Sequence, residues 1–174
     1  MKILIVYATT EGQTRKICGH ALEHLTTAGH SVALVPADTG SDIRPQSFDA
    51  AILAASVHAG KYQAALIDYA TTYAADLNAK RSLFLSVSLA AAGTDPEEHA
   101  DLDRIAASLS EASGWTPSRI EHVAGAFRFT EYDFLKYWAM RWIEHEKDPS
   151  VPPGTDREYT DWDALDAMLT DWAS

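Results

Sequence analysis

Five short apolar runs alternate with segments of helical periodicity in this chain, and this alternation limits the folds open to it. A continuous apolar run is typical of a strand buried on both faces, as in parallel sheets. The expected strands cover residues 2–7, 31–35, 49–56, 82–89 and 119–127. Strands joined by helices form right-handed βαβ units. The sequence therefore predicts an α/β fold with a doubly wound, five-stranded parallel sheet.

The segments between the expected strands carry apolar residues at helical spacing. We expect helices over residues 14–28 and 65–77, and a third marked by apolar residues between Leu102 and Leu109. A last helix follows Thr160, which forms a capping pair with Asp163 three residues later. Its apolar face consists of Trp162, Leu165, Leu169 and Trp172.

One segment exceeds what this fold needs. Residues 128–159 lie between the fifth expected strand and the last helix, and they are rich in aromatic side chains. Thr130 and Asp133 form a second capping pair at the start of a helical pattern, which the proline-rich residues 148–156 end. We therefore expect a single domain over residues 1–174 with an insertion at 128–159.

Composition excludes several classes of protein. The net charge of -11 disfavours nucleic-acid binding, which needs clustered Lys and Arg. Cys18 is the single cysteine, so neither an intrachain disulfide nor a cysteine-based metal centre is expected, and its place on the inner face of a helix predicts a core residue. Met1-Lys2 leads directly into a strand without a signal-peptide core, and no apolar run approaches the ~20 residues that span a bilayer. These features predict a cytoplasmic protein without a metal site.

The turn after the first expected strand has the residues of a phosphate-binding loop. It comprises Thr9, Thr10, Glu11, Gly12, Gln13 and Thr14. Three hydroxyls, a glycine that admits close approach, and the amides of a helix N-terminus can hold a phosphate without a lysine or a metal. Neither the three-glycine dinucleotide motif nor the P-loop is present. Mononucleotide binding is one interpretation; ordinary turn and capping hydrogen bonds are the other.

Two further loops are expected at the same edge of the sheet, where ligands bind in open parallel sheets. The loop after the third strand contains Ser56, Val57, His58, Ala59, Gly60 and Tyr62, and the fourth strand ends in Ser86, Val87, Ser88 and Leu89. His58 and Tyr62 could flank a flat isoalloxazine ring, and the small residues could lie under its edge. The alternatives are a surface histidine and a tyrosine that covers the sheet edge. His58 is the one candidate for acid or base catalysis.

The phosphate turn resembles that of the flavodoxin superfamily, Thr/Ser-x-Thr-Gly-x-Thr, although Glu11 replaces a usual hydroxyl residue. The whole chain resembles more closely the menaquinone-dependent protoporphyrinogen oxidases, flavodoxin-like proteins of haem biosynthesis. The similar stretches are EGQTR (11–15), ASVHAGKY (55–62), SVSL (86–89), SGWTPSRIEHVAGAFRF (113–129) and YTDW (159–162). That family also carries an insertion between strand five and the last helix.

The resemblance implies an FMN enzyme that performs the six-electron oxidation of protoporphyrinogen IX and passes electrons to a quinone of the respiratory chain. The family's insertion tends to be basic, whereas residues 127–147 here have equal numbers of acidic and basic side chains. Arg128, Lys136 and Arg141 are the expected partners of porphyrin propionates, with Trp138 beside the macrocycle. The insertion could equally cover the flavin, contact a membrane surface peripherally, form a homo-oligomer contact, or pack on its own sheet.

Two rival functions share this fold. The acidic surface favours a flavodoxin-like electron carrier, because it would attract basic redox partners. A receiver domain is less compatible with the sequence, since Ala8-Thr9 and Ser56 stand where a receiver needs acidic residues.

Overall fold

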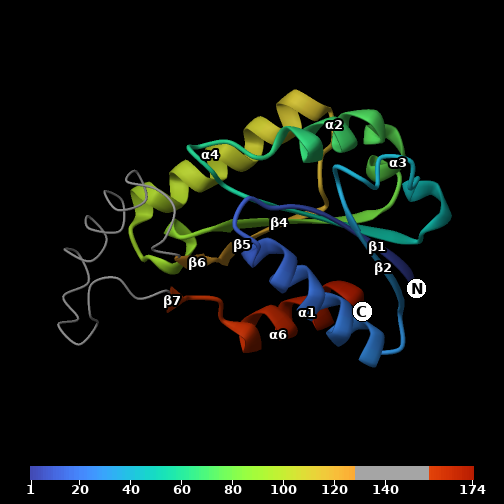
Figure 1. The fold of residues 1–174 in the computed structure, drawn as a ribbon, viewed down its shortest axis with the longest axis horizontal. Helices are drawn as coiled ribbons and strands as arrows, with labels where there is room; N and C mark the ends of the chain where they lie inside the picture. The colour runs from blue at the N-terminus through green and yellow to red at the C-terminus, as the bar shows by residue number, and fades with distance from the viewer. Residues whose placement is uncertain (128–156) are drawn as a thin grey trace.

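The strands form one parallel sheet in the order β2–β1–β3–β4–β5 in the computed structural model, which describes residues 1–127 and 157–174 (Figure 1). The strands are β1 (Lys2–Ala8), β2 (Ser31–Pro36), β3 (Ala50–Ser56), β4 (Arg81–Ser88) and β5 (Arg119–Ala124). The predicted doubly wound, five-stranded α/β fold is confirmed. β1 pairs with β2 on one side and β3 on the other, so the chain reverses its direction of winding at β1.

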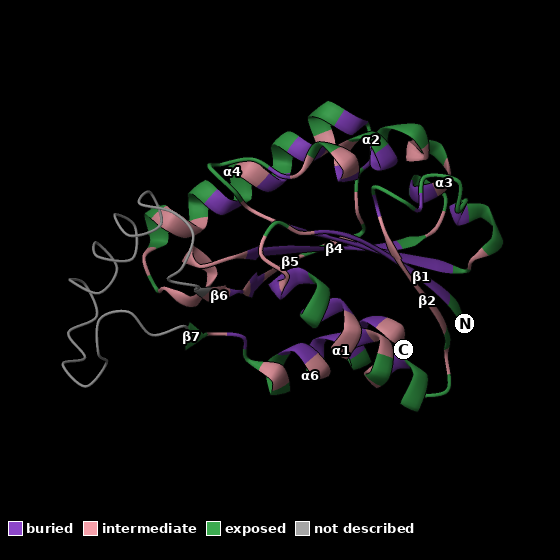
Figure 2. Ribbon diagram, in the orientation of Figure 1, coloured by how far each residue is buried: buried purple, intermediate pink, exposed green. Residues whose placement is uncertain are grey.

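Helices cover both faces of this sheet. The helices α1 (Gln13–Thr27) and α6 (Trp162–Ala173) lie on one face, and α2 (Ala64–Thr72), α3 (Ala74–Asn78) and α4 (Pro96–Ser113) lie on the other (Figure 1). Two short 3-10 helices, η1 (Pro45–Ser47) and η2 (Ala90–Ala92), lie in the connections. Figure 2 shows that the central strands are buried while the outer sides of the helices are exposed. No helix within the described residues is long and apolar enough to cross a membrane.

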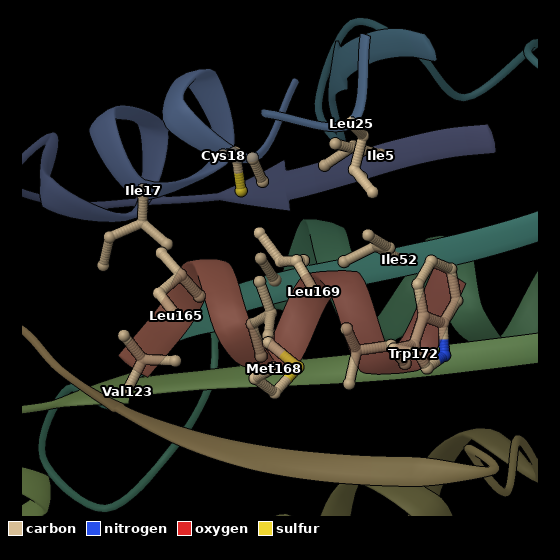
Figure 3. Packing of buried hydrophobic residues seen from close by; sticks show 14 of the residues in the cluster. Ile5, Ile17, Cys18, Leu25, Ile52, Val123, Leu165, Met168, Leu169 and Trp172 are labelled. Atoms are coloured by element: carbon tan, nitrogen blue, oxygen red, sulfur yellow. The ribbon is translucent and has the colours of Figure 1, made fainter. Parts of the chain in front are cut away.

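Each face of the sheet has its own apolar core. On the α1 and α6 side, Ile17 and Leu169 pack against Ile5 and Ile52 of the sheet (Figure 3). Cys18 belongs to the same core and is fully buried, as predicted. Burial of this kind contributes roughly 25 cal/mol per Å² of apolar surface. The two cores thus fix the sheet against both helix layers and hold its carboxyl edge in place.

The structure corrects the predicted ends of several elements. The fifth strand does not run to residue 127 but ends at Ala124. Gly125 follows, and a Cβ atom there would lie 3.3 Å from Val87 Cγ1, so the chain passes close to β4. Residues Ala126–Phe127 then form β6, which pairs antiparallel with β7 (Arg157–Glu158). The expected helix over 65–77 is two helices, because Tyr73 departs from helical geometry.

The predicted cap of the last helix is wrong by one residue. Asp161 caps α6, because its Oδ1 accepts a hydrogen bond of 2.9 Å from the Ala164 amide. Thr160 instead donates its hydroxyl proton to the carbonyl of Ala124, at 2.7 Å. The capping pair Thr130 and Asp133 lies outside the described residues.

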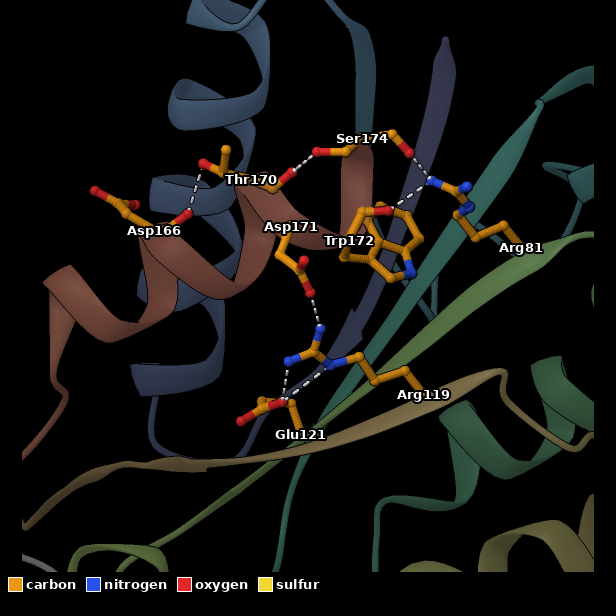
Figure 4. A network of polar contacts seen from close by, with 8 residues as sticks. All are labelled: Arg81, Arg119, Glu121, Asp166, Thr170, Asp171, Trp172 and Ser174. Carbon is orange, nitrogen blue, oxygen red and sulfur yellow. Dashed lines mark hydrogen bonds and ion pairs between the residues drawn. The ribbon is translucent and has the colours of Figure 1, made fainter.

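Two arginines from the sheet fix the C-terminal helix (Figure 4). Arg81 Nη1 donates to the carbonyl oxygens of Trp172 and Ser174, each at 2.7 Å, and so satisfies groups that a helix end leaves unpaired. Arg119 forms ion pairs with Asp171 at 2.8 Å and Glu121 at 3.1 Å. These contacts lie toward the amino ends of the strands, away from the loops that form the site described next.

Candidate functional site

The three predicted loops leave the sheet side by side. Ala8 at the end of β1 is paired with Ala55, and Ser56 at the end of β3 is paired with Val87. The carboxyl ends of β1, β3 and β4 therefore lie at one edge, where β1 is also the point at which the winding reverses. Ligands of doubly wound sheets bind at such a point.

The first loop forms an open helix N-terminus. Gly12 has a φ of 90°, a conformation that favours glycine, and precedes α1. Its amide donates to Thr9 Oγ1 at 2.9 Å, and Thr9 keeps its own hydroxyl proton for another acceptor. No side chain of the described residues caps α1, and no atom lies within 4 Å of the position of a Cβ on Gly12. The amides of the first turn are thus arranged to receive an anion.

Thr14 provides a second sign of a missing acceptor or donor. Its side chain is fully buried in the first turn of α1, and its Oγ1 has no hydrogen-bond partner among the described residues. A buried hydroxyl without a partner costs about 1–3 kcal/mol, so such groups are rare unless a ligand completes them. Thr14 therefore does not cap α1, whereas Thr9 does make an ordinary turn hydrogen bond to the Gly12 amide. The loop fits a phosphate group.

Gln63, which was not predicted as a site residue, joins the second loop to the first by hydrogen bonds. Its Nε2 donates to Ser56 Oγ at 2.7 Å and to Thr10 Oγ1 at 3.0 Å. Its Oε1 is buried and has no partner among the residues described. Gln63 stands at the N-cap position of α2, where glutamine is unusual, and that position is the one signal that could have marked it.

Residues 58–61 form a tight, exposed turn. The amides and carbonyls of His58 and Lys61 exchange hydrogen bonds of 2.8 and 3.0 Å, and the two residues between them, Ala59 and Gly60, both have positive φ. Two successive positive φ values are typical of a type I′ turn. The turn therefore holds the His58 backbone in a fixed place at the site edge, with its side chain exposed.

Tyr62 points inward from the end of its loop. Its ring is buried, lies edge-on to Phe84 at 5.0 Å, and its hydroxyl is hydrogen bonded to Ser86 Oγ at 2.8 Å. Burial raises the pKa of Tyr62 to about 12, although the Ser86 hydrogen bond opposes the shift. Ser86 and Val87 are buried as well. These residues support the loops from beneath, as expected of a tyrosine that covers the sheet edge, and a contact of Tyr62 with the flavin stays a prediction.

Some of the remaining predicted residues are partly exposed, and the others lie outside the described residues. Glu11, Val57, Ser88 and Leu89 are partly exposed. Ser88 Oγ accepts from the Ala91 amide at 3.2 Å and so begins η2. The expected substrate residues Arg128, Lys136, Trp138 and Arg141 lie outside the described residues, and within those described no three His, Cys, Asp or Glu side chains form a metal site.

Comparison with known sequences gives matches over nearly the whole chain. Residues 4–151 match the family model of the flavodoxin domain. Protoporphyrinogen IX dehydrogenase [quinone] of Escherichia coli K12 is 27% identical over 166 residues, which are 95% of this chain and 91% of that protein. A protein of the same name from Leishmania major is 26% identical over 174 residues, which are 99% of this chain and 75% of that protein.

Solved structures with the same fold include flavodoxins and an NADH:FMN oxidoreductase, all at low identity. Oxidised flavodoxin 2 of Bacillus cereus has a TM-score of 0.53 at 17% identity and covers 83% of this chain and 99% of its own. A flavodoxin mutant of Fusobacterium nucleatum, solved with flavin mononucleotide bound, has a TM-score of 0.52 at 14% identity and covers 99% of this chain and 92% of its own. The sheet order, the position of the open helix N-terminus and the family match agree, and the chain belongs to the flavodoxin domain family.

Proposed function

We propose that this chain is an FMN-dependent oxidoreductase that oxidises protoporphyrinogen IX to protoporphyrin IX with a quinone as electron acceptor. The observation that carries the proposal is the colinear match, over 95% or more of this chain, to relatives named protoporphyrinogen IX dehydrogenase [quinone] from two distant organisms. The flavodoxin structures support the fold and the cofactor class, but not a substrate.

The described residues fit the phosphate of FMN. The hydroxyls of Thr9, Thr10 and Thr14 and the amides of the first turn of α1 would hold this group, since α1 is uncapped and Thr14 Oγ1 lacks a partner within the described chain. The turn at 58–61 and the end of β4 at Ser88 would border the flavin ring. When bound, FMN supplies the redox chemistry, and the protein supplies binding and orientation.

The electrons and protons of the proposed reaction balance with protoporphyrinogen IX and a quinone as the two reactants. Protoporphyrinogen IX loses six electrons and six protons to become protoporphyrin IX, and three quinone molecules take them up as quinols. His58 is the one histidine on the three loops, so we propose it as the group that accepts a substrate proton. Its exposure on a fixed turn supports this role.

An electron carrier is the second candidate, and the net charge of -11 favours it. An acidic protein attracts a basic redox partner and speeds encounter at low salt. A carrier would accept electrons from a reductase yet leave protoporphyrinogen unchanged.

Absorption spectroscopy separates these functions. The purified protein is mixed with FMN, freed of excess flavin, and given protoporphyrinogen IX without oxygen, then a soluble quinone. The enzyme should show flavin bands that bleach with the porphyrinogen and return with the quinone, together with porphyrin fluorescence. Flavin bands that do not change with the porphyrinogen would refute the oxidase and favour the carrier, which a reductase should then reduce. A protein that retains no flavin would refute both functions.

A further inference from the structure

Glu158 of β7 contacts the first turn of α1 across a long separation in sequence. Its Oε2 accepts hydrogen bonds from Gln13 Nε2 at 3.1 Å and from Lys16 Nζ at 2.5 Å. Its Oε1 accepts from Trp162 Nε1 at 3.0 Å. One carboxylate thus joins the start of α1 to the start of α6.

The backbone that carries this carboxylate is held by the β6–β7 pairing. Glu158 is paired with Ala126 in the β6–β7 ladder, and the next residue, Tyr159, donates its amide to the Gly125 carbonyl at 3.0 Å. The Lys16 hydrogen bond, with smaller contributions from Gln13 and Trp162, lowers the pKa of Glu158 although partial burial opposes it. Glu158 therefore stays ionised at neutral pH and keeps all three donors.

Gln13 is the residue through which this contact reaches the site. Its side chain is buried and donates both to Glu158 and to Thr160 Oγ1, which is 3.1 Å away and is itself held by the Ala124 carbonyl. Its backbone is the first residue of α1, directly after Gly12. The side chain and the amide of one residue thus serve two different partners.

We propose that Glu158, acting through Gln13 and Lys16, positions the first turn of α1 for the phosphate group of the flavin. The inference rests on the proposed function, because it assigns that turn to the FMN phosphate. Glu158 touches no cofactor in this account and is a positioning residue. Its charge alone would act in the opposite direction, since a carboxylate near a phosphate repels it.

The test compares FMN with riboflavin, which lacks the phosphate. Gln13→Met keeps the length of the side chain and the backbone amide but removes the donor to Glu158 and Thr160. We expect FMN affinity, measured by quenching of flavin fluorescence, to fall about tenfold while riboflavin affinity stays the same. A loss of general stability would weaken both ligands alike.

Asp166→Asn is the matched control. Asp166 of α6 contacts His20 at 2.7 Å and His24 at 3.2 Å on the same α1 helix, but further from the phosphate turn. This variant should leave the ratio of FMN to riboflavin affinity unchanged. An Asp166→Asn ratio that falls as far as that of Gln13→Met would overturn a specific role for the Gln13 contact.

Glu158→Gln is the second variant, and the sign of its effect decides between positioning and charge. Weaker FMN binding supports positioning, because Lys16 loses its ion pair and the turn loses its anchor. Tighter or unchanged FMN binding would refute the proposal. Wild-type protein that binds no FMN would refute the proposed function itself, so the two failures are distinguishable.

Discussion

Replacing Thr14 by valine should stabilise the protein without flavin and weaken the binding of FMN. Valine has nearly the shape of threonine and a similar helix propensity, so the change removes the hydroxyl and little else. Thr14 is fully buried, and its Oγ1 has no partner among the described residues. The same hydroxyl is thus a cost to folding and, in our proposal, a donor to the phosphate.

The two effects can be estimated separately. A buried, unpaired hydroxyl costs about 1–3 kcal/mol, so the apo variant should gain about 1 kcal/mol or more, or about 2–4 °C in Tm per kcal/mol for a chain of this size. A hydrogen bond to a charged group contributes about 1.5–3 kcal/mol, so FMN affinity should fall by roughly ten- to a hundred-fold.

Urea unfolding with and without FMN measures both effects together. At an FMN concentration 100 times the wild-type Kd, ligand binding stabilises the wild type by about 2.7 kcal/mol, whereas a variant weakened a hundred-fold gains only ~0.4 kcal/mol. With an apo gain of about 1 kcal/mol and a hundred-fold loss of affinity, the order of stability should reverse: the variant is the more stable apo protein, and the wild type is the more stable with FMN.

Thr27→Val is the control at the other end of α1. Thr27 is exposed and donates to the Glu23 carbonyl at 2.9 Å, so its loss should change FMN affinity little. The reasoning about Thr14 fails if its valine variant is less stable than the wild type without FMN, because the hydroxyl then has a partner inside the protein. It fails equally if FMN binds the variant as tightly as before.

Two further predictions concern buried groups. Tyr62→Phe should destabilise the protein by about 1 kcal/mol at neutral pH, since the buried Ser86 hydroxyl loses its partner. The pKa of Tyr62 rises from 10.0 to about 12 on folding, so the stability of the wild type should fall as pH rises from about 10 to 12. The fall should be smaller in Tyr62→Phe, which has no phenol to ionise at this position. Denaturant unfolding of both proteins at several pH values measures the two falls, and equal falls would contradict the prediction. Cys18 should resist Ellman's reagent until the protein unfolds, because burial raises the pKa of its thiol and no surface is exposed; rapid labelling of the native protein would show that α1 opens readily.

The order of the elements was predictable because each strand of a parallel sheet is a continuous apolar run. The predicted strands at 2–7, 49–56 and 82–89 begin and end within one residue of the observed strands β1, β3 and β4. The end of β5 was not predictable in this way, because the apolar pattern continues through residues 126–127. Residues 119–124 pair with β4, whereas residues 126–127 pair with β7. The hydrophobic pattern of a strand indicates that it is buried, but it does not indicate which strand it pairs with.

The candidate site was predictable only where backbone conformation depends on local residues. Gly12 and the hydroxyls beside it mark a turn at the end of β1, and the structure gives that glycine a positive φ. Gln63 could be found only by its N-cap position and Glu158 not at all, because their contacts join segments separated by 53 and 145 residues in sequence. The inward orientation of Tyr62 was not predictable, since an aromatic residue in a loop can turn inward as readily as outward.

The helix N-termini of this fold differ in their caps. Both α4 and α6 begin with aspartates, Asp95 and Asp161, whose carboxylates accept amide hydrogen bonds of the first turn. The α1 helix instead has Gly12 at its N-cap, whose φ is 90°, with no capping side chain among those described. A carboxylate at that position would occupy and repel the place of a phosphate. The α1 helix shares the missing side-chain cap with α2 and α3, but it alone of the three has a glycine with positive φ at its N-cap, and the open first turn leaves room for an anion.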